Sequence, residues 1–498
     1  MQLKELIRPL LVHTVTGDPN VEITGIQMDS RLVKPGDLFV AVRGFTVDGH
    51  QYVSAAIQNG AAAVMVESPV DSDVPVIMVP DSRRALAVVA AEYYRHPTRE
   101  LKLIGITGTN GKTTTSYLIE KLLGDAGHPA GVIGTVQMKI GDKIFPAKHT
   151  TPEAHDLQKG FRMMRDEGCE YSVIEVSSHG LALGRTRGSQ FHIGVFTNLT
   201  QDHLDYHKTM EEYRQAKGLL FSQLGNRYAS EPGENAFAVL NADDEASAYY
   251  AAITPAQVVT YGIDCPADVR ASNIRITGRG TAFTLETFRG SCEMTLQLIG
   301  KFNVYNALAA ISVGLIEGLP LAEIKRSLEQ IPGVNGRFEP VHAGQPYTVL
   351  VDYAHTPDSL ENVLTTIREF AQKKVTCVVG CGGDRDRTKR PLMARIAAKY
   401  SDWTIFTSDN PRSEEPEAII EDMLAGIDPA ERDKVVTIAD RRQAITEAIR
   451  LAEPGDIILI AGKGHETYQE IQGVRYDFDD RQVAREAIEA RAEGGNGQ

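Results

Sequence analysis

The stretch LKLIGITGTNGKTTTSYLIEKLL, residues 101–123, decides the fold of the chain around it. Its apolar start, 101–107, is typical of a buried strand, and the run 113–123 is typical of a helix. A turn rich in glycine and threonine lies between them. This order predicts a phosphate-binding loop, because the first backbone N–H groups of a helix bind anions.

The turn GTNGKTT carries the groups that a bound nucleotide needs. Its glycines allow the backbone to approach phosphate closely, Lys112 would reach the β- and γ-phosphates, and the Thr113 hydroxyl would bind magnesium. The strict pattern fails at one position, where Ile106 replaces the first glycine, so a simple glycine-rich turn with a surface lysine is the alternative. The predicted nucleotide-binding residues are Gly108, Thr109, Asn110, Gly111, Lys112, Thr113 and Thr114.

Working outward from this loop, apolar strands alternate with helix-like stretches, which favours parallel sheets with crossover helices. Strands are predicted at 37–42, 63–67, 75–79, 171–176, 192–197, 236–240, 348–351, 376–380, 403–407 and 456–460. Breaks at His96-Pro97 and at Ile331-Pro332-Gly333 divide the chain. We expect three α/β domains, with a central P-loop parallel-sheet domain and a C-terminal Rossmann-like domain that binds ligand at its strand ends. Their predicted bounds are 1–97, 98–331 and 332–498.

Length and charge exclude several classes of protein. The 498 residues exceed what one hydrophobic core usually holds. A formal charge of −14 argues against nucleic acid as the main partner. No apolar run approaches the roughly 18 residues of a membrane span, and no signal peptide is apparent. The five cysteines, an odd number, do not suggest a disulfide framework. We therefore expect a cytoplasmic protein without membrane insertion.

Two further segments carry candidate metal ligands. EVSSHGL (175–181) follows a strand, and a carboxylate such as Glu175 beside a phosphate loop is where a magnesium ligand belongs. Capping of the next turn is the alternative role for this carboxylate. TNLTQDHLDYH (197–207) offers Asp202 or His203 as a ligand, although single histidines are more often structural.

The segment YRQAKGLLF (213–221) is typical of an amphipathic helix with apolar Tyr213, Leu220 and Phe221. Taken in isolation, Lys217 is interpreted as a solvated lysine on its surface.

Together these motifs resemble those of the Mur ligases of peptidoglycan synthesis. The matching segments are TGTNGKTT, EVSSHGL, TNLTQDHLDYH, YRQAKGLLF, GKFNVYNALAA (300–310), GRFE (336–339), DYAHTPDSL (352–360), CGGDRDRTKRPLM (381–393), SDNPRSEEP (408–416) and AGKGHE (461–466). The stretch from Asp29 to His50 is similar to the uridine-binding domain of the same enzymes. The resemblance covers nearly the whole chain, and the combination is specific although the single motifs are not.

The resemblance implies an ATP-dependent carbon–nitrogen ligase. The pattern is most similar to the members that add the third residue of the stem peptide, and DNPR (409–412) resembles the signature of those that add meso-diaminopimelate. The acceptor would be UDP-N-acetylmuramoyl-L-alanyl-D-glutamate, whose D-glutamyl γ-carboxylate becomes an acyl phosphate before the amine attacks. Mg²⁺ and ATP are the implied cofactor and co-substrate, and we expect a monomer.

The resemblance also implies roles for individual residues. The catalytic residues would be Lys112, Glu175, His203, Lys217, Arg337 and Asp352. The magnesium ligands would be Thr113, Glu175, His203 and Lys217, the last as a carbamate. ATP would also contact Asn303, Asn306 and Arg337. The UDP-muramoyl-dipeptide would contact Ser30, Thr150, Thr151, Ser177 and Arg185, although a turn-capping role is the alternative for Ser30. Arg337 and Asp352 lie beyond the predicted linker, so the third domain must close over the second to bring them to ATP.

For diaminopimelate, the resemblance implies a site made of Arg385, Asp409, Asn410, Pro411, Arg412, Gly462 and Glu466. The distal end of this amino acid carries a carboxylate, which Arg412 or Arg385 can bind in bidentate fashion, and an ammonium for Asp409 and Glu466. Lysine lacks that carboxylate and would leave a guanidinium unpaired, which can discriminate by about 10⁴–10⁵. A plain turn with Arg412 on the surface is the alternative.

Three other functions compete with this one. Folylpolyglutamate synthase shares the central chemistry but lacks the uridine-domain pattern and DNPR. The ligase that adds D-Ala-D-Ala shares the N-terminal pattern but should lack DNPR and GKGHE together. A regulatory module without catalysis should have lost some of Lys112, Glu175, His203 and Lys217. The base that deprotonates the amine is open, with His355 beside Asp352 as a candidate.

Overall fold

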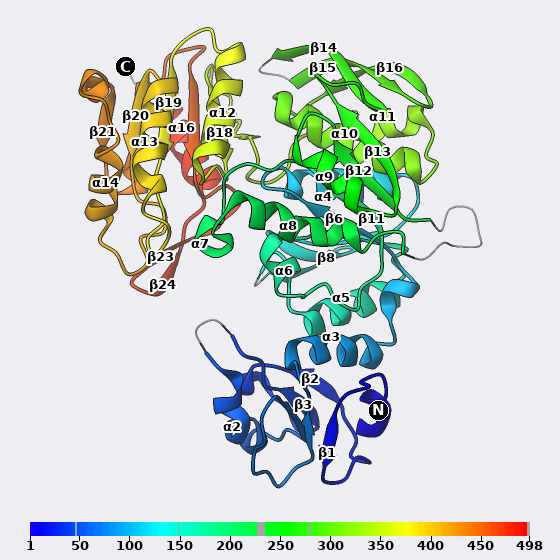
Figure 1. Ribbon diagram of the computed structural model, residues 1–498. Coiled ribbons are helices and arrows are strands. Elements are labelled where there is room, and N and C mark those ends of the chain that lie inside the picture. Colours follow the sequence, from blue (N-terminus) through cyan, green and yellow to red (C-terminus); the bar gives the residue numbers. More distant parts are fainter. Residues whose placement is uncertain (45–46, 148, 227–234, 278–279, 496–498) are drawn as a thin grey trace.

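The computed structural model describes residues 1–44, 47–147, 149–226, 235–277 and 280–495, which form three α/β domains (Figure 1). Each domain is built around a sheet of its own. The three sheets lie within residues 14–78, 102–296 and 339–461. The prediction of a three-domain α/β fold with a parallel central sheet is confirmed.

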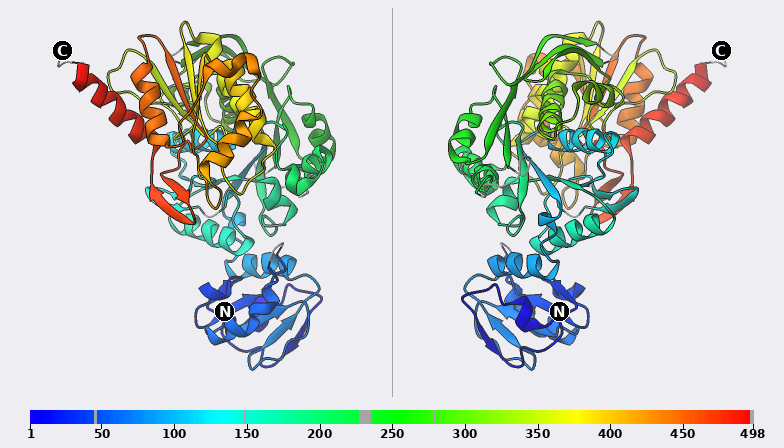
Figure 2. Two further views of the ribbon diagram at one scale, coloured as in Figure 1. Left: turned by 90° about the vertical axis from the view of Figure 1, so that its left-hand side faces the viewer. Right: turned by 90° about the vertical axis from the view of Figure 1, so that its right-hand side faces the viewer.

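The N-terminal domain holds a five-stranded sheet of order β1-β5-β4-β3-β2, in which only the β1–β5 pair is antiparallel. The strands are β1 (Thr14–Thr16), β2 (Gly25–Gln27), β3 (Asp37–Val40), β4 (Ala63–Val66) and β5 (Val76–Met78). The helices are α1 (Leu3–Leu6), α2 (Val53–Gln58) and α3 (Ser82–Tyr93). This domain lies apart from the other two, and α3 packs on α5 of the central domain (Figures 1 and 2).

The central domain has an eleven-stranded sheet of order β16-β15-β14-β13-β12-β11-β6-β10-β7-β8-β9. The strands are β6 (Lys102–Thr107), β7 (Ala130–Ile133), β8 (Gln137–Ile140), β9 (Lys143–Pro146), β10 (Tyr171–Glu175), β11 (Phe191–Phe196), β12 (Phe237–Asn241), β13 (Gln257–Gly262), β14 (Val269–Thr277), β15 (Gly280–Thr287) and β16 (Gly290–Leu296). Its middle strands are parallel and almost wholly buried, as expected for a sheet covered on both faces. Both edges are antiparallel, and the sequence analysis missed these edge strands.

Helices cover both faces of the central sheet. One apolar cluster joins the sheet to α4 (Lys112–Asp125), α10 (Lys301–Ile316) and α11 (Leu321–Glu329). A second joins it to α5 (Ala154–Asp166), α8 (Met210–Ser222) and α9 (Ala246–Ile253). The short helices α6 (Ser178–Ala182) and α7 (Leu204–His207) follow β10 and β11. The carboxyl ends of the parallel strands therefore meet at one edge, where the phosphate loop lies.

The C-terminal domain has a six-stranded sheet of order β17-β18-β22-β19-β20-β21, parallel except at β17, and a separate hairpin, β23–β24. The strands are β17 (Glu339–Pro340), β18 (Thr348–Asp352), β19 (Val375–Val379), β20 (Trp403–Phe406), β21 (Val435–Thr437), β22 (Ile457–Ala461), β23 (Tyr468–Ile471) and β24 (Val474–Asp477). The helices are α12 (Pro357–Phe370), α13 (Lys389–Tyr400), α14 (Pro416–Leu424), α15 (Arg441–Leu451) and α16 (Asp480–Gly495). The first three helices cover one face, and the last two cover the other.

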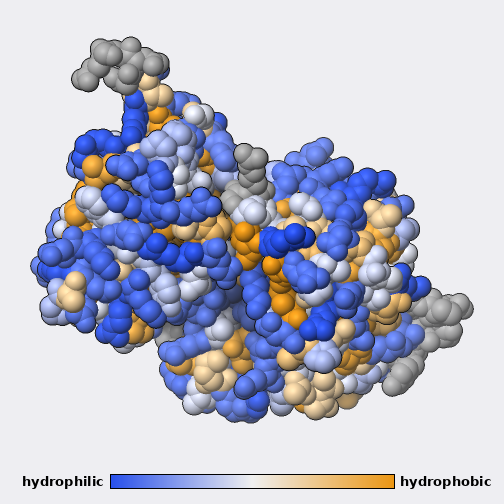
Figure 3. All heavy atoms as spheres, turned by 90° about the horizontal axis from the view of Figure 1, so that it is seen from above, coloured by the Kyte–Doolittle hydropathy of each residue, from blue (hydrophilic) through white to orange (hydrophobic). Residues whose placement is uncertain are grey.

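Seen from above, the C-terminal and central domains face each other across a hollow in which apolar side chains gather (Figure 3). Within the described part of the chain, no helix combines the length and the apolar character needed to cross a membrane.

Candidate active site

The phosphate loop joins β6 to α4 as the sequence predicts. Gly111 precedes the first helical residue with φ of +84°, and a Cβ built there would lie 2.3 Å from Oδ1 of Asn306, so the position requires glycine. The backbone N–H of Asn110 donates to Oδ1 of Asn198 at 2.9 Å, and its carbonyl accepts from Oγ1 of Thr197 at 2.6 Å. The residues that follow β11, Thr197 and Asn198, therefore hold the phosphate loop by hydrogen bonds.

Lys112 folds back over this loop. Its Nζ donates to the carbonyl oxygens of Gly108 at 2.9 Å and Thr109 at 2.7 Å. Desolvation lowers the pKa of Lys112, although the carboxylates of Glu175 and Asp202 oppose this effect. A cation held among carbonyls and near carboxylates is placed to turn toward phosphate oxygens.

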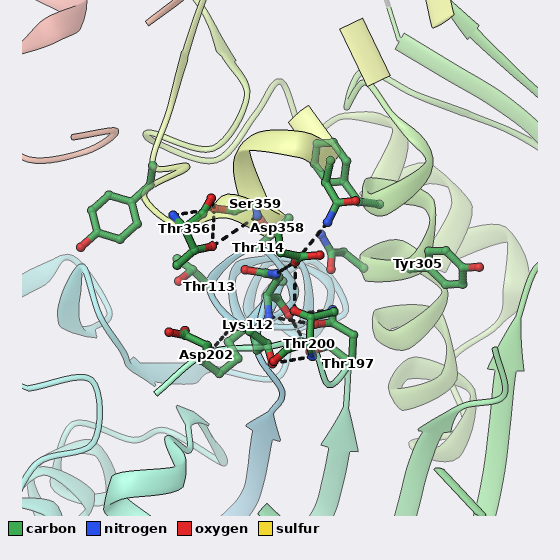
Figure 4. A pocket seen from close by; sticks show the side chains of 18 of the residues that line it. Lys112, Thr113, Thr114, Thr197, Thr200, Asp202, Tyr305, Thr356, Asp358 and Ser359 are labelled. Atoms are coloured by element: carbon green, nitrogen blue, oxygen red, sulfur yellow. Dashed lines mark hydrogen bonds between the residues drawn. The ribbon is translucent and has the colours of Figure 1, made fainter. Parts of the chain in front are cut away.

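A cavity of about 600 Å³ opens above the loop between the central and C-terminal domains (Figure 4). Nη2 of Arg337 donates to Oγ1 of Thr113 at 3.2 Å, so the C-terminal domain reaches the start of α4. The cavity brings together the predicted residues Thr109, Asn110, Gly111, Lys112, Thr113, Thr114, Thr150, Glu175, Ser177, His203, Lys217, Asn306, Arg337 and Asp352.

Glu175 ends β10 and is buried at the floor of this cavity. Its carboxylate accepts from the backbone N–H and from Oγ1 of Thr135, at 3.1 and 2.8 Å. The cap of the following turn is instead Ser177, whose Oγ accepts from the N–H of Gly180 at 3.0 Å. The turn-capping alternative for Glu175 is therefore wrong.

Lys217 is 1% exposed, so its interpretation as a surface lysine is wrong. The face of α8 that carries it packs against the phosphate loop, and its Nζ donates to the carbonyl of Gly108 at 2.8 Å. The same Nζ lies 4.4 Å from the ring centroid of Tyr213. Burial, together with the charge of Lys112, lowers the pKa of Lys217 well below its ordinary value. Burial therefore favours the neutral amine, the form that acts as a nucleophile, more than water does.

The donors around the cavity fit a magnesium ion that is shared with a substrate. Glu175 supplies a carboxylate, Thr113 a hydroxyl and His203 an imidazole to the same space. Desolvation lowers the pKa of His203 to about 4, against the opposing effect of Asp202. Among the residues that the structure describes, no three His, Cys, Asp or Glu side chains form a metal site by themselves. Mg²⁺ commonly uses one or two carboxylates and completes its shell with phosphate and water.

The predicted ATP contacts on α10 are arranged in two layers. Asn306 lines the cavity, while Asn303 lies behind it and outside the lining. Nδ2 of Asn303 donates to the carbonyl of Ile299 at 2.9 Å, and its Oδ1 accepts from Nδ2 of Asn306 at 3.2 Å. Asn303 thus orients Asn306 in this structure. A lining residue that sequence analysis missed is Tyr305, which donates to Oδ2 of Asp243 at 2.8 Å.

The predicted muramoyl-dipeptide residues of the central domain form one hydrogen-bonded group. Oγ1 of Thr151 donates to the carbonyl of Glu175 at 2.9 Å and lies 3.0 Å from Oγ of Ser177. Nη1 of Arg185 donates to the carbonyl of Thr151 at 2.9 Å. The hydroxyl oxygens of Thr150 and Thr135 lie 3.1 Å apart.

Ser30 lies in the N-terminal domain and does not line the cavity. It is buried, and its carbonyl accepts from Nδ2 of Asn59 at 2.8 Å. The turn is capped by Asp29, whose Oδ1 accepts from the N–H of Arg31 at 3.0 Å. The turn-capping role proposed as the alternative for Ser30 is therefore filled by Asp29.

The predicted diaminopimelate residues lie outside the cavity, on three loops that follow β19, β20 and β22. Nη1 of Arg412 donates to the carbonyl of Gly383 at 2.7 Å, and its side chain is 20% exposed, so it is not a plain surface arginine. Nδ2 of Asn410 donates to Oε2 of Glu466 at 2.8 Å. Burial and the charge of Asp409 raise the pKa of Glu466. The rest of the set, Arg385, Pro411 and Gly462, lies on the same loops, with Arg385 exposed.

Asp358 is the most informative residue that sequence analysis missed. It lies in the first turn of α12 and points across the domain boundary toward the phosphate loop (Figure 4). Its Oδ2 accepts from Nδ2 of Asn110 at 2.6 Å and from Oγ1 of Thr200 at 2.9 Å. The motif DYAHTPDSL contained this residue, but only the contact identifies its role.

Three family models match the chain: "Mur ligase family, catalytic domain" at 22–94, "Mur ligase middle domain" at 106–314 and "Mur ligase, glutamate ligase domain" at 336–464. The chain belongs to the Mur ligase family. This Mur ligase is 54% identical over 489 residues to the UDP-N-acetylmuramoyl-L-alanyl-D-glutamate–2,6-diaminopimelate ligase of Bacillus velezensis, covering 98% of this chain and 99% of that one. It is 53% identical to the protein of the same name in Listeria monocytogenes, covering 99% of each.

Solved structures of other Mur ligases have the same fold. A structure of a UDP-N-acetylmuramoyl-L-alanyl-D-glutamate–2,6-diaminopimelate ligase matches with a TM-score of 0.70 and 35% identity, covering 99% of both chains. MurF from Thermotoga maritima, solved with ADP, matches with a TM-score of 0.65 and 19% identity, covering 95% of this chain and 98% of that one. The predicted resemblance to the diaminopimelate-adding Mur ligases is confirmed, and the chain is an ATP-dependent ligase of peptidoglycan precursor synthesis.

Proposed function

We propose that the cavity between the central and C-terminal domains is where ATP phosphorylates the D-glutamyl γ-carboxylate of UDP-N-acetylmuramoyl-L-alanyl-D-glutamate. The amine of meso-diaminopimelate then attacks the acyl phosphate, and phosphate leaves from the tetrahedral intermediate. The observation that carries this assignment is the convergence of Lys112, Glu175, Lys217 and Arg337 on one cavity. Lys112, Glu175 and Lys217 come from α4, β10 and α8 of the central domain, and Arg337 comes from the loop before β17.

The chemistry requires cations at this place. A carboxylate and a triphosphate repel each other by several kcal/mol per pair of charges at low dielectric. Lys112 and Arg337 flank the start of α4, whose N–H groups add a favourable partial charge. Phosphoryl transfer depends mainly on positioning and charge stabilisation, so these groups suffice without a protein nucleophile. Magnesium, held by Glu175, Thr113 and His203, would neutralise phosphate charge when bound.

We assign Lys217 as a carbamate in the active enzyme. The neutral amine attacks CO₂ and loses one proton, which gives an anion in place of a cation. The charge of Lys112 favours this change, because that ammonium repels a second cation and attracts an anion. The resulting oxygens would supply the further magnesium ligands that Glu175 and His203 alone do not provide.

The roles of the remaining substrate-binding residues are proposed from the resemblance to the family and from the loops on which they lie. Thr150, Thr151, Ser177 and Arg185 hold the muramoyl dipeptide, and Ser30 lies on the uridine-binding domain. Arg412 and Arg385 bind the distal carboxylate of diaminopimelate, while Asp409 and Glu466 bind its ammonium. We further propose that the enzyme acts as a monomer in the cytoplasm, where ATP and nucleotide-linked precursors are available.

Phosphate release from ATP tests the proposal directly. The enzyme is mixed with ATP, Mg²⁺ and the UDP-muramoyl-dipeptide, and meso-diaminopimelate or L-lysine is offered separately. Turnover with diaminopimelate alone is expected. Turnover with lysine instead would retain the ligase and overturn the roles of Arg412 and Arg385. Turnover with neither would overturn the proposed reaction.

A further inference from the structure

A fully buried ion pair lies beneath the loops of the proposed diaminopimelate site. Arg441 begins α15, Asp480 begins α16, and both side chains are 0% exposed. Nε of Arg441 donates to Oδ1 of Asp480 at 2.8 Å, and Nη2 donates to Oδ2 at 2.7 Å. A buried pair of this kind adds little stability over an apolar pair, so its geometry calls for another explanation.

The remaining N–H groups of Arg441 bind two strand ends. Nη1 donates to the carbonyl of Ser408 at 3.2 Å, and Nη2 donates to the carbonyl of Ala461 at 3.0 Å. Ser408 follows β20 and Ala461 ends β22, and these strands are not neighbours, because β19 lies between them. One guanidinium therefore spans the carboxyl edge of the sheet across an intervening strand.

These two carbonyls directly precede the proposed substrate contacts. Ser408 is followed by Asp409, and Ala461 by Gly462. Gly462 has φ of +116°, and a Cβ built on it would lie 2.6 Å from Oδ2 of Asp409, so the two loops meet at close range. The guanidinium of Arg441 also interacts electrostatically with the carboxylates of Asp409 and Glu466.

We propose that Arg441, oriented by Asp480, is a positioning residue that sets the spacing of the Asp409 and Glu466 loops and so determines selection of the amino-acid substrate. The inference deepens the proposed function and rests on it, since it takes these loops as the amino-acid site. Arg441 acts through the loops and does not touch the substrate. The planar fork of a guanidinium can bind two carbonyls and a carboxylate at once, which an ammonium cannot do in the same geometry.

The test compares Arg441→Lys and Asp480→Asn with the wild-type enzyme in steady-state kinetics. In each variant, KM for meso-diaminopimelate should rise by about 10–100-fold, because the residues that bind the substrate lose the support that positions them. KM for ATP should stay within about twofold, because the phosphate loop lies in another domain. The preference for diaminopimelate over lysine should fall by a similar factor. Melting temperature is measured for each variant.

Arg368→Lys is the matched control. Arg368 donates to the carbonyl of Tyr400 at 2.6 Å and pairs with Asp402 at 3.0 Å, at the opposite edge of the same sheet. This variant should lower the melting temperature without changing KM for diaminopimelate. Equal effects of Arg368→Lys and Arg441→Lys on KM would overturn the inference, as would an unchanged KM in the two Arg441 and Asp480 variants. If neither Arg441→Lys nor Asp480→Asn folds, the ion pair serves the stability of the core, and the inferred positioning role is overturned.

Arg412→Ala separates this inference from the proposed function. A raised KM in Arg412→Ala with an unchanged KM in Arg441→Lys would overturn the positioning role alone. An unchanged KM for diaminopimelate in Arg412→Ala would instead place the amino-acid site elsewhere and overturn the proposed function.

Discussion

At the scale of single residues, burial acts in opposite directions on two groups beside the cavity. The pKa of Lys217 is lowered well below its ordinary value, because burial disfavours the ammonium. Burial raises the pKa of Asp352 to about 6, although the charge of Arg337 opposes this effect. Both groups are therefore closer to neutrality than in water, which is common where a site is arranged for charged substrates.

The amine of Lys217 is expected to be indispensable. Lys217→Ala should lower kcat by about 10²–10³-fold, the usual effect of removing one electrostatic group from an active site. Short-chain carboxylic acids should restore part of the activity, because they supply the missing anion. Phosphate release with and without the acid measures this. Full activity of the variant without any added acid would disprove the carbamate.

Asp352 should make the protein less stable as the pH rises. Between about pH 4 and 6 the folded state keeps a proton that the unfolded state has lost, so the free energy of unfolding falls through this window. Asp352→Asn removes the penalty and should gain about 2–3 kcal/mol relative to wild type between pH 4 and 7. Urea unfolding at both pH values measures the gain. If the free energies of unfolding of Asp352→Asn and the wild type differ by the same amount at every pH, the raised pKa of Asp352 is contradicted.

At the scale of secondary structure, α10 ends in a network at the amino edge of the central sheet. Glu317 follows the last helical residue and accepts from Nζ of Lys102 at 2.6 Å and from the hydroxyl of Tyr171 at 2.6 Å. Nε2 of His192 lies 2.7 Å from its other oxygen. Burial alone would raise the pKa of Glu317, but these partners lower it to about 2. The network joins α10 to the starts of three adjacent strands, β6, β10 and β11.

Glu317→Gln should destabilise the fold without affecting catalysis, because the phosphate loop lies at the opposite edge. The depressed pKa means that the contribution of Glu317 is complete above about pH 4.5 and is lost as the pH falls toward 2. The variant should lose about 2–3 kcal/mol at pH 7 and less at pH 4. Urea unfolding and kcat are measured together. Glu100→Gln, which removes two more exposed ion pairs near this edge, is the control and should cost under about 1 kcal/mol.

At the scale of the whole molecule, the domains are joined by polar contacts and by apolar packing of Ile299 and Phe302 with Phe338. Asp358 of the C-terminal domain binds Asn110 of the phosphate loop, and Arg337 binds Thr113 of α4. Glu153 of the central domain binds Arg83 of the N-terminal domain at 3.0 Å. A small interface of polar contacts and a few apolar side chains suits domains that close around a substrate.

Asp358→Ala should shift the enzyme toward a more open arrangement. The variant loses the hydrogen bonds to Asn110 and Thr200, so KM for ATP should rise about 10-fold. Small-angle scattering of the unliganded protein should show a larger radius of gyration. Glu361→Ala, on the same helix but bonded to Tyr400 of α13, is the control. A scattering curve and a KM equal to those of the wild type would refute the role of Asp358.

Local sequence patterns were sufficient to predict many of the buried strands of the fold. The runs 101–107 and 171–176 predict β6 and β10 within a residue, because buried parallel strands are continuously apolar. The antiparallel strands β14 and β16 escaped prediction, since many of their side chains are exposed and their apolar pattern is weaker. The motifs also predicted part of the cavity lining, because the phosphate loop is one continuous segment and Glu175 ends a buried strand.

Side-chain environments depended on contacts between distant segments. The pattern of its own helix indicates a surface position for Lys217, and the residue is buried because α8 packs against the phosphate loop at Gly108. Asp358 meets Asn110 across 248 positions, and Arg441 meets Asp480 across 39. The amino-acid order thus determined which segments become strands, helices and phosphate loops, since these follow from short-range periodicity and backbone geometry. Burial, charge state and partnership were decided by the tertiary structure alone, because they depend on which surfaces exclude water from one another.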